Sequence, residues 1–251
     1  MCGIAGIVGQ IDETHRAALR RMSDAMTHRG PDADGFWEAE PDSAGWGPML
    51  AHRRLAILDL SPSGVQPMID GPTGDVVVLN GEIYNYRALR AELPQGGADL
   101  GSSGDTAVML RSLSLHGAAA IPRLRGMFAF AHWSRPDRRL TLARDPLGIK
   151  PLYLARNPDP KGRWSLAFAS ELRALLASGL LGRARLDPTA VASVVWNGFT
   201  VAPNTVVEGI ETMWPGELLV ADARGTTLER RAYWQLPRLR NQEDFSEEAL
   251  A

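Results

Sequence analysis

Apolar residues along this chain gather in short runs separated by polar turns, and most of these runs have the length of a β-strand. The run Val76-Val77-Val78-Leu79, rich in β-branched side chains, is typical of a strand buried on both faces. By the same criterion we expect strands at residues 4–8, 34–38, 48–58, 76–80, 126–133, 139–144, 164–169, 218–220 and 227–234.

A second pattern, with apolar residues three and four positions apart, predicts helices between these strands. The helix near 187–197 has Asp187 as its expected N-cap and Pro188 at its first position. For the helix near 105–116, Ser103 and Asp105 are the two candidate N-caps. The expected helices cover residues 13–27, 85–93, 105–116, 170–178 and 187–197.

The order of these elements favours antiparallel sheets over parallel ones. Turn-forming residues at 135–138 and 222–225 join neighbouring strands as hairpins. Helices inserted in groups among hairpins are typical of sheets covered by helices rather than of βαβ crossovers. The pattern therefore predicts an α+β fold.

Composition and charge narrow the class of protein. The 251 residues include 27 Lys and Arg against 29 Asp and Glu, a net charge of −2 with no basic run. Nucleic acids and anionic membranes both need clustered basic residues, so we expect neither as a partner. No apolar stretch approaches the roughly 20 residues that span a bilayer.

The single cysteine stands at position 2. One cysteine forms no internal disulfide and no zinc cluster of several cysteines, so no metal site of that kind is expected. The first residues lack the basic region of a signal peptide and soon become polar, which predicts a cytoplasmic location.

Removal of Met1 would leave Cys2 with both a thiol and a free α-amine. An α-amine has a pKa of about 8 and a thiol one of about 8.5, so this residue can supply a base and a nucleophile together. The alternative is that Cys2 is an inert small residue that opens a strand. Lipidation would require a signal peptide, which the sequence lacks.

A series of motifs decides between these interpretations. The chain opens with Cys2-Gly3-Ile4-Ala5-Gly6, and the motifs that follow in order are residues 28–32, 50–59, 79–85, 102–106, 126–131 and 144–153. This series resembles the glutaminase domain of class II, N-terminal-nucleophile glutamine amidotransferases. Pro31 and the full 144–153 motif resemble the glutamine-hydrolysing asparagine synthetase branch, and the resemblance runs from Cys2 to about Trp234.

The resemblance implies a four-layer αββα fold with two antiparallel sheets stacked between helices. It also implies a glutaminase domain at residues 2–237, followed at 238–251 by a linker or the start of an ATP-dependent synthetase domain. That second domain would carry a Ser-Gly-Gly-x-Asp-Ser loop for ATP, which does not occur in these 251 residues. ATP and Mg²⁺ are therefore expected only in the missing domain, and the glutaminase step needs no cofactor.

The resemblance assigns the reaction to Cys2 and to an oxyanion hole. Cys2 would be the nucleophile and its α-amine the base, while the side chain of Asn80 and the backbone of Gly81 would stabilise the oxyanion. The alternative for Asn80-Gly81 is a plain turn after the strand at 76–80, because Asn-Gly is a common turn pair.

The resemblance also implies the residues that bind glutamine, listed as Arg54, Leu55, Ile57, Leu58, Glu82 and Asp105. By the resemblance Arg54 would bind the α-carboxylate; neighbouring Arg53 would point to the opposite face of a strand, so only one of the two arginines can line the pocket. Glu82 and Asp105 would bind the α-ammonium. The family often has an acidic residue where this chain has Ala107, so a secondary contact is missing.

Other residues of the motifs have structural explanations. His52 is expected to be structural, and Arg29 and Asp32 are expected to pin the loop over the site. Strand alternation places Met127, Phe128 and Phe130 in the core. Residues 144–153 are expected to shape an interface or an ammonia path towards a second domain.

We therefore expect the glutaminase half of an asparagine-synthetase-like amidotransferase, with L-glutamine as substrate and a synthetase domain as the partner that accepts ammonia. A homodimer is compatible with the sequence. Three alternatives stay open: a stand-alone glutamine-sensing domain, an amidase for another amide, and an amidotransferase whose acceptor is not aspartate.

Overall fold

The computed structural model describes residues 1–56 and 62–236, and their strands form two antiparallel sheets of six. The first sheet has the order β10 (Ile210–Thr212), β8 (Tyr153–Arg156), β9 (Trp164–Ala169), β1 (Gly3–Gln10), β3 (Trp46–Arg54) and β2 (Ala33–Glu38). The second has the order β12 (Thr227–Ala232), β11 (Glu217–Asp222), β7 (Arg139–Arg144), β6 (Gly126–Ser134), β5 (Val76–Ile83) and β4 (Met68–Ile69).

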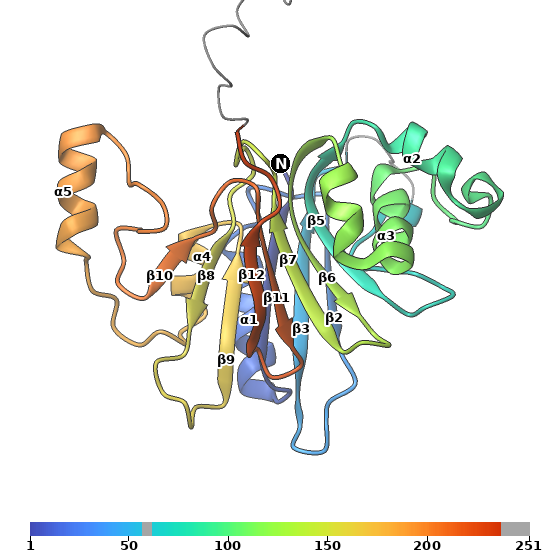
Figure 1. Cartoon of the computed structure of the whole chain (residues 1–251). Helices are drawn as coiled ribbons and strands as arrows, with labels where there is room; N and C mark the ends of the chain where they lie inside the picture. The colour runs from blue at the N-terminus through green and yellow to red at the C-terminus, as the bar shows by residue number, and fades with distance from the viewer. Residues whose placement is uncertain (57–61, 237–251) are drawn as a thin grey trace, which may run out of the picture.

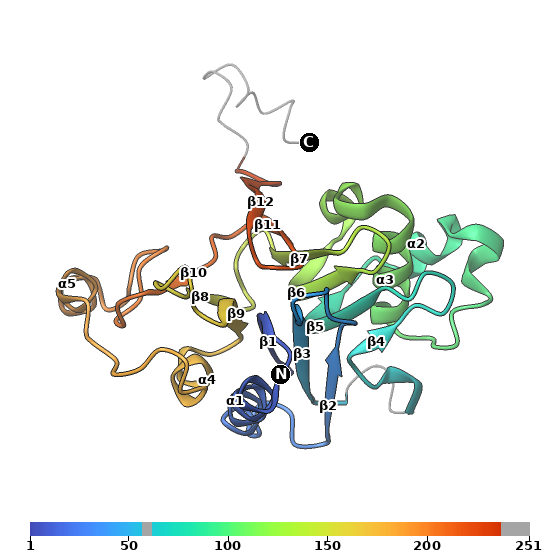
Figure 2. The same cartoon turned by 90° about the horizontal axis from the view of Figure 1, so that it is seen from below.

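Helices cover the outer face of each sheet (Figures 1 and 2). The first sheet is covered by α1 (Glu13–Asp24) and α4 (Leu172–Ala177), and the second by α2 (Tyr86–Glu92) and α3 (Asp105–His116). Three 3₁₀ turns complete this part of the chain: η1 (Pro62–Gly64), η2 (Pro94–Gly97) and η3 (Gly117–Arg123). The four layers confirm the αββα arrangement that the sequence predicted.

Three apolar clusters separate these layers. The central cluster lies between the sheets and contains Ile4, Leu50 and Val78, all fully buried. One outer cluster joins the first sheet to Met22 of α1, and the other joins the second sheet to Val108 of α3. Each sheet is therefore buried on both faces, which explains the nearly continuous apolar runs in the sequence.

Strand alternation determines which cluster each residue joins. In β5, Val76 and Val78 face the other sheet, whereas Val77 and Leu79 face the helices α2 and α3. A strand's side chains point alternately to its two faces, so later residues of β5 continue the same assignment.

Most predicted elements are confirmed, and α3, β7 and β9 have the predicted bounds. The short strands β4, β8 and β10 were not predicted, because two to four residues are too few to establish a pattern. The predicted strand 48–58 ends at Arg54, and its last two residues lie outside the described part.

The predicted caps differ in outcome. Asp187 caps the helix α5 (Pro188–Asn197), accepting hydrogen bonds from the backbone N–H groups of Thr189 and Ala190. For α3 the prediction of Ser103 or Asp105 was wrong, because the N-cap is Gly104 and no side chain caps the helix. Asp105 is the first helical residue and binds backbone N–H groups elsewhere.

The helix α5 stands apart from the two sheets (Figures 1 and 2). Ala190 is its buried residue, whereas Val195 and Trp196 are 82% and 89% exposed. No helix within residues 1–56 and 62–236 is long and apolar enough to cross a membrane.

Candidate active site

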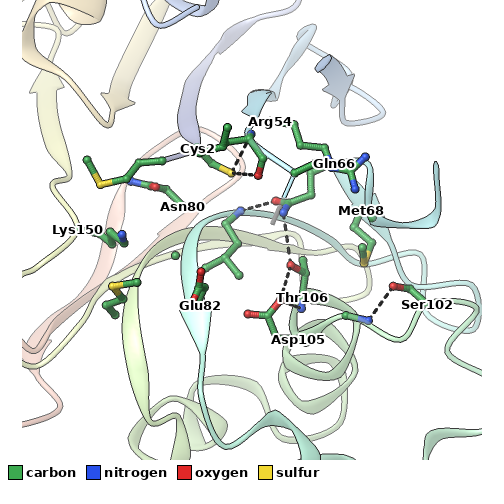
Figure 3. Close-up of a pocket in the computed structure, with 18 residues that line it drawn as sticks. Cys2, Arg54, Gln66, Met68, Asn80, Glu82, Ser102, Asp105, Thr106 and Lys150 are labelled. Carbon is green, nitrogen blue, oxygen red and sulfur yellow. Dashed lines mark hydrogen bonds between the residues drawn. The ribbon is translucent and has the colours of Figure 1, made fainter. Parts of the chain in front are cut away.

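A pocket opens at one end of the space between the two sheets, where the apolar side chains of the central cluster give way to polar ones (Figure 3). Its polar residues lie on the same strand faces as the central cluster. Cys2 lies two positions before Ile4 and directly precedes β1, Arg54 lies on the face of Leu50 on β3, and Asn80 lies two positions after Val78 on β5. Two sheets in register thus bring polar side chains from three strands to one place.

The pocket brings together most of the residues predicted for the site. Its lining includes Cys2, Arg54, Leu55, Asn80, Gly81, Glu82 and Asp105. The two remaining predicted residues, Ile57 and Leu58, lie outside the described residues. The roles of all these residues stay predictions, but their proximity is a property of the fold.

The thiol of Cys2 lies against the end of β3. Its Sγ is 3.6 Å from the carbonyl oxygen of Leu55, and the N–H of Leu55 lies 3.4 Å from Sγ. Burial raises the pKa of the Cys2 thiol, although the Leu55 N–H and the neighbouring cations oppose this change. A thiol in this setting needs a base before it can attack as a thiolate.

Arg29 fixes the backbone of Cys2 rather than a loop above the pocket. Its Nε donates to the carbonyl oxygen of Cys2 at 2.9 Å, and its Nη1 pairs with Glu171 at 3.0 Å. His28 also contacts Glu171, at 2.9 Å. The first part of the 28–32 motif therefore anchors the start of β1.

The second part of this motif holds the end of β3. The backbone N–H of Asp32 donates to the carbonyl oxygen of Arg54 at 3.1 Å, and its carboxylate accepts from the N–H of Ala56 at 2.8 Å. A Cβ at Gly30 would lie 2.3 Å from the carbonyl carbon of Arg53, so only glycine fits there. Asp32 pins the segment that follows Arg54, as the sequence predicted.

Arg53 and Arg54 point to opposite faces of the first sheet. Arg53 donates to the backbone and hydroxyl oxygens of Ser23 and pairs with Asp24 at the end of α1. Arg54 is buried and lines the pocket. Strand alternation thus selects Arg54 for the pocket, as expected from the sequence.

Asn80 is fully buried in the wall of the pocket. Neither its amide nitrogen nor its carbonyl oxygen has a hydrogen-bond partner within the described residues. A buried amide without partners is costly, so such a group is suited to a ligand that enters the pocket. Asn80 belongs to the strand β5 and pairs with Ala129, which removes the alternative of a plain turn.

Gly81 is required by the close approach of β6. A Cβ at this position would lie 2.1 Å from the carbonyl oxygen of Met127 and 2.6 Å from the Cα of Phe128. Any side chain here would push β5 and β6 apart, which would also displace Asn80. The glycine is therefore explained by backbone packing, whatever its N–H does in the pocket.

Two carboxylates, Glu82 and Asp105, lie in the same pocket wall. The oxygens of Asp105 accept from the backbone N–H groups of Ile83 and Thr106, both at 2.8 Å. Burial raises the pKa of Asp105, and the nearby charge of Glu82 adds to this effect. A ligand cation placed between the two carboxylates would offset both the cost of burying the charge of Asp105 and its repulsion by Glu82.

His52 lies below the pocket, in the layer between the sheets. Its side chain is 1% exposed, and Nε2 lies 3.2 Å from the carbonyl oxygen of Leu79, to which it can donate. Burial lowers its pKa to about 4, so it is neutral at physiological pH. His52 does not line the pocket, in agreement with the structural role expected from the sequence.

Several pocket residues were not predicted, foremost Lys150, Gln66 and Thr106. Gln66 accepts from the N–H of Leu79 at 2.6 Å and donates to the hydroxyl of Thr106 at 3.4 Å. Met127 was predicted to be core but lines the pocket, because it lies on the inter-sheet face at the very start of β6. Phe128 and Phe130 are fully buried.

The described residues contain no group of three or more His, Cys, Asp or Glu side chains that could hold a metal ion.

Comparison with known proteins identifies the family. The family described as "Glutamine amidotransferase domain" matches residues 1–234. The chain belongs to this family. Glutamine-hydrolysing asparagine synthetase 1 of Bacillus subtilis is 33% identical over 220 residues, which cover 86% of this chain and 33% of that protein. Amidase chry2 of Gibberella zeae is 35% identical over 219 residues, which cover 87% of this chain and 30% of that protein.

The fold of this amidotransferase domain also occurs among solved structures. Glutamine phosphoribosylpyrophosphate amidotransferase from B. subtilis aligns with a TM-score of 0.65 and 18% identity, covering 93% of this chain and 50% of that chain. This likeness concerns the fold alone. The chain spans about a third of the length of the curated relatives it matches.

Proposed function

We propose that this amidotransferase domain hydrolyses L-glutamine to L-glutamate and ammonia through a thioester on Cys2, after removal of Met1. The observation that carries the proposal is the meeting of the chain's one thiol, an unpartnered buried amide and paired carboxylates in one pocket. The family supplies the class of reaction, because its members are glutamine amidotransferase domains.

The first half of the reaction forms the thioester. The α-amine of Cys2 takes the proton of the thiol, and Sγ attacks the side-chain amide carbon of glutamine. The carbonyl electrons move to oxygen, which accepts hydrogen bonds from Asn80 and from the N–H of Gly81; each such donor contributes about 3 kcal/mol. The carbon–nitrogen bond then breaks, and the departing nitrogen takes the proton from the α-amine and leaves as ammonia.

The second half releases glutamate. Water attacks the thioester carbon while the α-amine accepts its proton, and the intermediate collapses with return of that proton to Sγ. The burial that raises the pKa of the Cys2 thiol explains why the mechanism needs this amine: without a base, little thiolate forms at neutral pH.

Substrate recognition follows from charge. Arg54 offers a planar two-pronged cation for the α-carboxylate, and Glu82 with Asp105 offers two carboxylates for the α-ammonium. Leu55 lies in the pocket beside Cys2, and we propose that its backbone, with those of Ile57 and Leu58, completes the binding of glutamine.

Two measurements on the purified chain test the proposal. Intact mass should show the loss of Met1, and the chain should release glutamate and ammonia from glutamine in equal amounts. The C2A variant should keep glutamine binding, measured by calorimetry, and lose glutamate release. A folded chain without Met1 that binds glutamine but releases no glutamate would contradict catalysis and favour the glutamine-sensing alternative.

The destination of the ammonia is a further proposal. Relatives named as glutamine-hydrolysing asparagine synthetases are about three times as long as the matched region, so a synthetase domain that consumes ATP and Mg²⁺ would amidate aspartate beyond this part. Under this proposal residues 2–237 form the glutaminase domain and 238–251 lead into the next one. The glutaminase step itself uses no cofactor.

One observation favours a different acceptor or amide. A relative of similar identity is named as an amidase, Amidase chry2 of Gibberella zeae. The hydrolysis rates of glutamine, asparagine and simple carboxamides show whether glutamine or another amide is the substrate. The paired charges of the pocket predict that only an amide carrying both α-groups of an amino acid is cleaved at an appreciable rate.

A further inference from the structure

Lys150 is a cation in the pocket to which the proposed reaction assigns no role. The residue is 5% exposed and lines the pocket together with Cys2. Within the described residues its ammonium has no hydrogen bond or ion pair. Its ammonium nitrogen reaches the pocket, where its charge can act on negative charge that arises there during the reaction.

The backbone of Lys150 is held at both ends by two charged residues. Its N–H donates to a carboxylate oxygen of Asp145 at 2.9 Å, and its carbonyl oxygen accepts from Nε of Arg144 at 2.8 Å. Asp145 is fully buried and also accepts from the N–H groups of Leu147 and Ile149. The motif at 144–150 therefore forms a rigid support that delivers the Lys150 side chain to the pocket.

The position of Lys150 separates it from the groups that would bind the amino-acid end of glutamine. In Figure 3 Lys150 lies on one side of Asn80, whereas Arg54 and Asp105 lie on the other. Its ammonium is thus on the side of the reacting thiol that faces away from the α-carboxylate site. A role in binding the α-carboxylate does not fit this arrangement.

We propose that Lys150 is an electrostatic residue of the glutaminase reaction: its ammonium stabilises negative charge on Cys2 Sγ and on the oxyanion. The same cation disfavours the protonated form of the Cys2 α-amine, because like charges repel, and so keeps this base ready at neutral pH. The proposal rests on the proposed function, and Lys150 neither gives nor takes a proton in it.

The other charged groups around Cys2 do not stabilise the thiolate and the oxyanion in this way. Arg54 is the second pocket cation, but the α-carboxylate of glutamine would neutralise it. Arg29 binds the Cys2 carbonyl oxygen and is paired with Glu171, while His52 is neutral at physiological pH.

The pocket carboxylates complete this set of charges. Glu82 and Asp105 lie across the pocket and would be occupied by the substrate ammonium. On its own loop, Lys150 has Asp145 and Arg144 at its backbone, and these two residues carry opposite charges. With glutamine bound, Lys150 is thus the pocket cation whose charge no group of the substrate offsets.

The test measures the ionisation of Cys2 directly. Cys2 is the chain's one cysteine, so its alkylation by iodoacetamide at a series of pH values reports its thiolate alone. In K150M we expect the alkylation profile and the rising limb of glutaminase activity against pH to move about one unit to higher pH. K150R keeps the charge, so its profiles should stay close to those of the wild type.

Controls distinguish this role from a structural one. K161M removes a lysine from an exposed turn and should move neither profile. A merely structural defect would lower activity at every pH without moving the limb. If K150M does not fold, K150Q provides the same test and should show the same shift.

A failure of the proposal for Lys150 can be distinguished from a failure of the proposed function. If wild-type protein has no glutaminase activity, the proposed function fails, whereas the alkylation profiles still decide whether Lys150 acts on Cys2. Identical alkylation profiles for the wild type and the charge-removing variant would overturn the proposal. So would a K150R profile that shifts as far as that of K150M.

Discussion

At the scale of single residues, the pocket contains two carboxylates close to one another and a buried amide without a partner in the described part of the chain. Glu82 and Asp105 repel each other, and the amide of Asn80 has no partner within the described residues. Glutamine carries an α-ammonium and an amide carbonyl that would satisfy both. The binding of this substrate would therefore remove electrostatic and hydrogen-bonding costs that the free domain bears.

The first residue-scale prediction concerns Glu82. E82Q removes one pocket carboxylate but keeps the shape of the side chain, so KM for glutamine should rise about tenfold or more while kcat changes little; this reflects the loss of one charge-assisted hydrogen bond. Steady-state kinetics measure both constants. E40Q, at an exposed position, is the matched control. An unchanged KM in E82Q would remove Glu82 from the binding site.

The second residue-scale prediction concerns the effect of His52 on the pH dependence of stability. Its pKa in the folded chain is about 4, against about 6.5 when unfolded, so the unfolded state binds an extra proton between these values. The contribution of neutral His52 to the free energy of unfolding is therefore fully present above pH 6.5 and falls as the pH decreases. By pH 5 the loss amounts to about 2 kcal/mol.

Urea denaturation at pH 7 and pH 5 measures this contribution. H52Q should lose less unfolding free energy between the two pH values than the wild type, because glutamine does not titrate. H116Q, at an exposed histidine, should behave as the wild type does. Equal losses in H52Q and the wild type would show that His52 is not the cause.

The sequence was informative about single residues where strand alternation decides. It predicted that only one of Arg53 and Arg54 lines the pocket, because neighbouring residues of a strand point to opposite faces, and the family resemblance indicated Arg54. It failed for Met127, which was predicted to be core but lies where β6 extends past the end of the central cluster. It also failed for Lys150, whose position depends on a loop held by Arg144 and Asp145 rather than on any pattern.

At the scale of elements, the site depends on how β5 and α3 are held together. Arg111 of α3 is buried and donates to Asp70, between β4 and β5, at 2.7 Å, and to Asp99 at 2.8 Å. Asp105, at the start of the same helix, binds the N–H of Ile83 on β5. The helix and the strand, each of which carries one of the two pocket carboxylates, are thus held in a fixed relation.

This arrangement predicts a large effect at Arg111. R111M leaves the buried carboxylate of Asp70 without its cation, so the free energy of unfolding should fall by about 3 kcal/mol. The double variant D70N/R111M should recover part of the loss. R123M breaks the exposed pair between Arg123 and Glu92 and should cost less than about 1 kcal/mol in the same urea denaturation.

Two results would contradict this account of the helix. One is a loss in R111M as small as that in R123M. The other is a double variant that is no more stable than R111M, since the cost would then not arise from the unpaired carboxylate.

Elements were predictable where a run was long and periodic. The helix α3 and the strand β7 have the predicted bounds, because both combine a clear apolar pattern with clear ends. The strands β8 and β10 pair with each other at the edge of the first sheet, and the partner strand rather than local sequence forms them. The cap of α3 was missed because Gly104 offers no side-chain signal.

At the scale of the whole molecule, the candidate pocket is a consequence of stacking two sheets. The starts of β1 and β6 and the ends of β3 and β5 meet at one end of the central cluster, where apolar residues give way to polar ones. The order of the elements predicted antiparallel sheets covered by helices, and the family resemblance implied their four layers. The register between the sheets was not predictable, because it depends on which side chains interlock across the gap.

The central claim is that Cys2, freed of Met1, is the nucleophile that attacks glutamine. The most direct test is labelling with a diazo-ketone analogue of glutamine, followed by intact mass and peptide mapping. The account predicts one adduct per chain on Cys2, formed only after Met1 is removed, prevented by excess glutamine and absent in C2A. A folded chain that has lost Met1 and binds glutamine, yet remains unlabelled at Cys2, would contradict it.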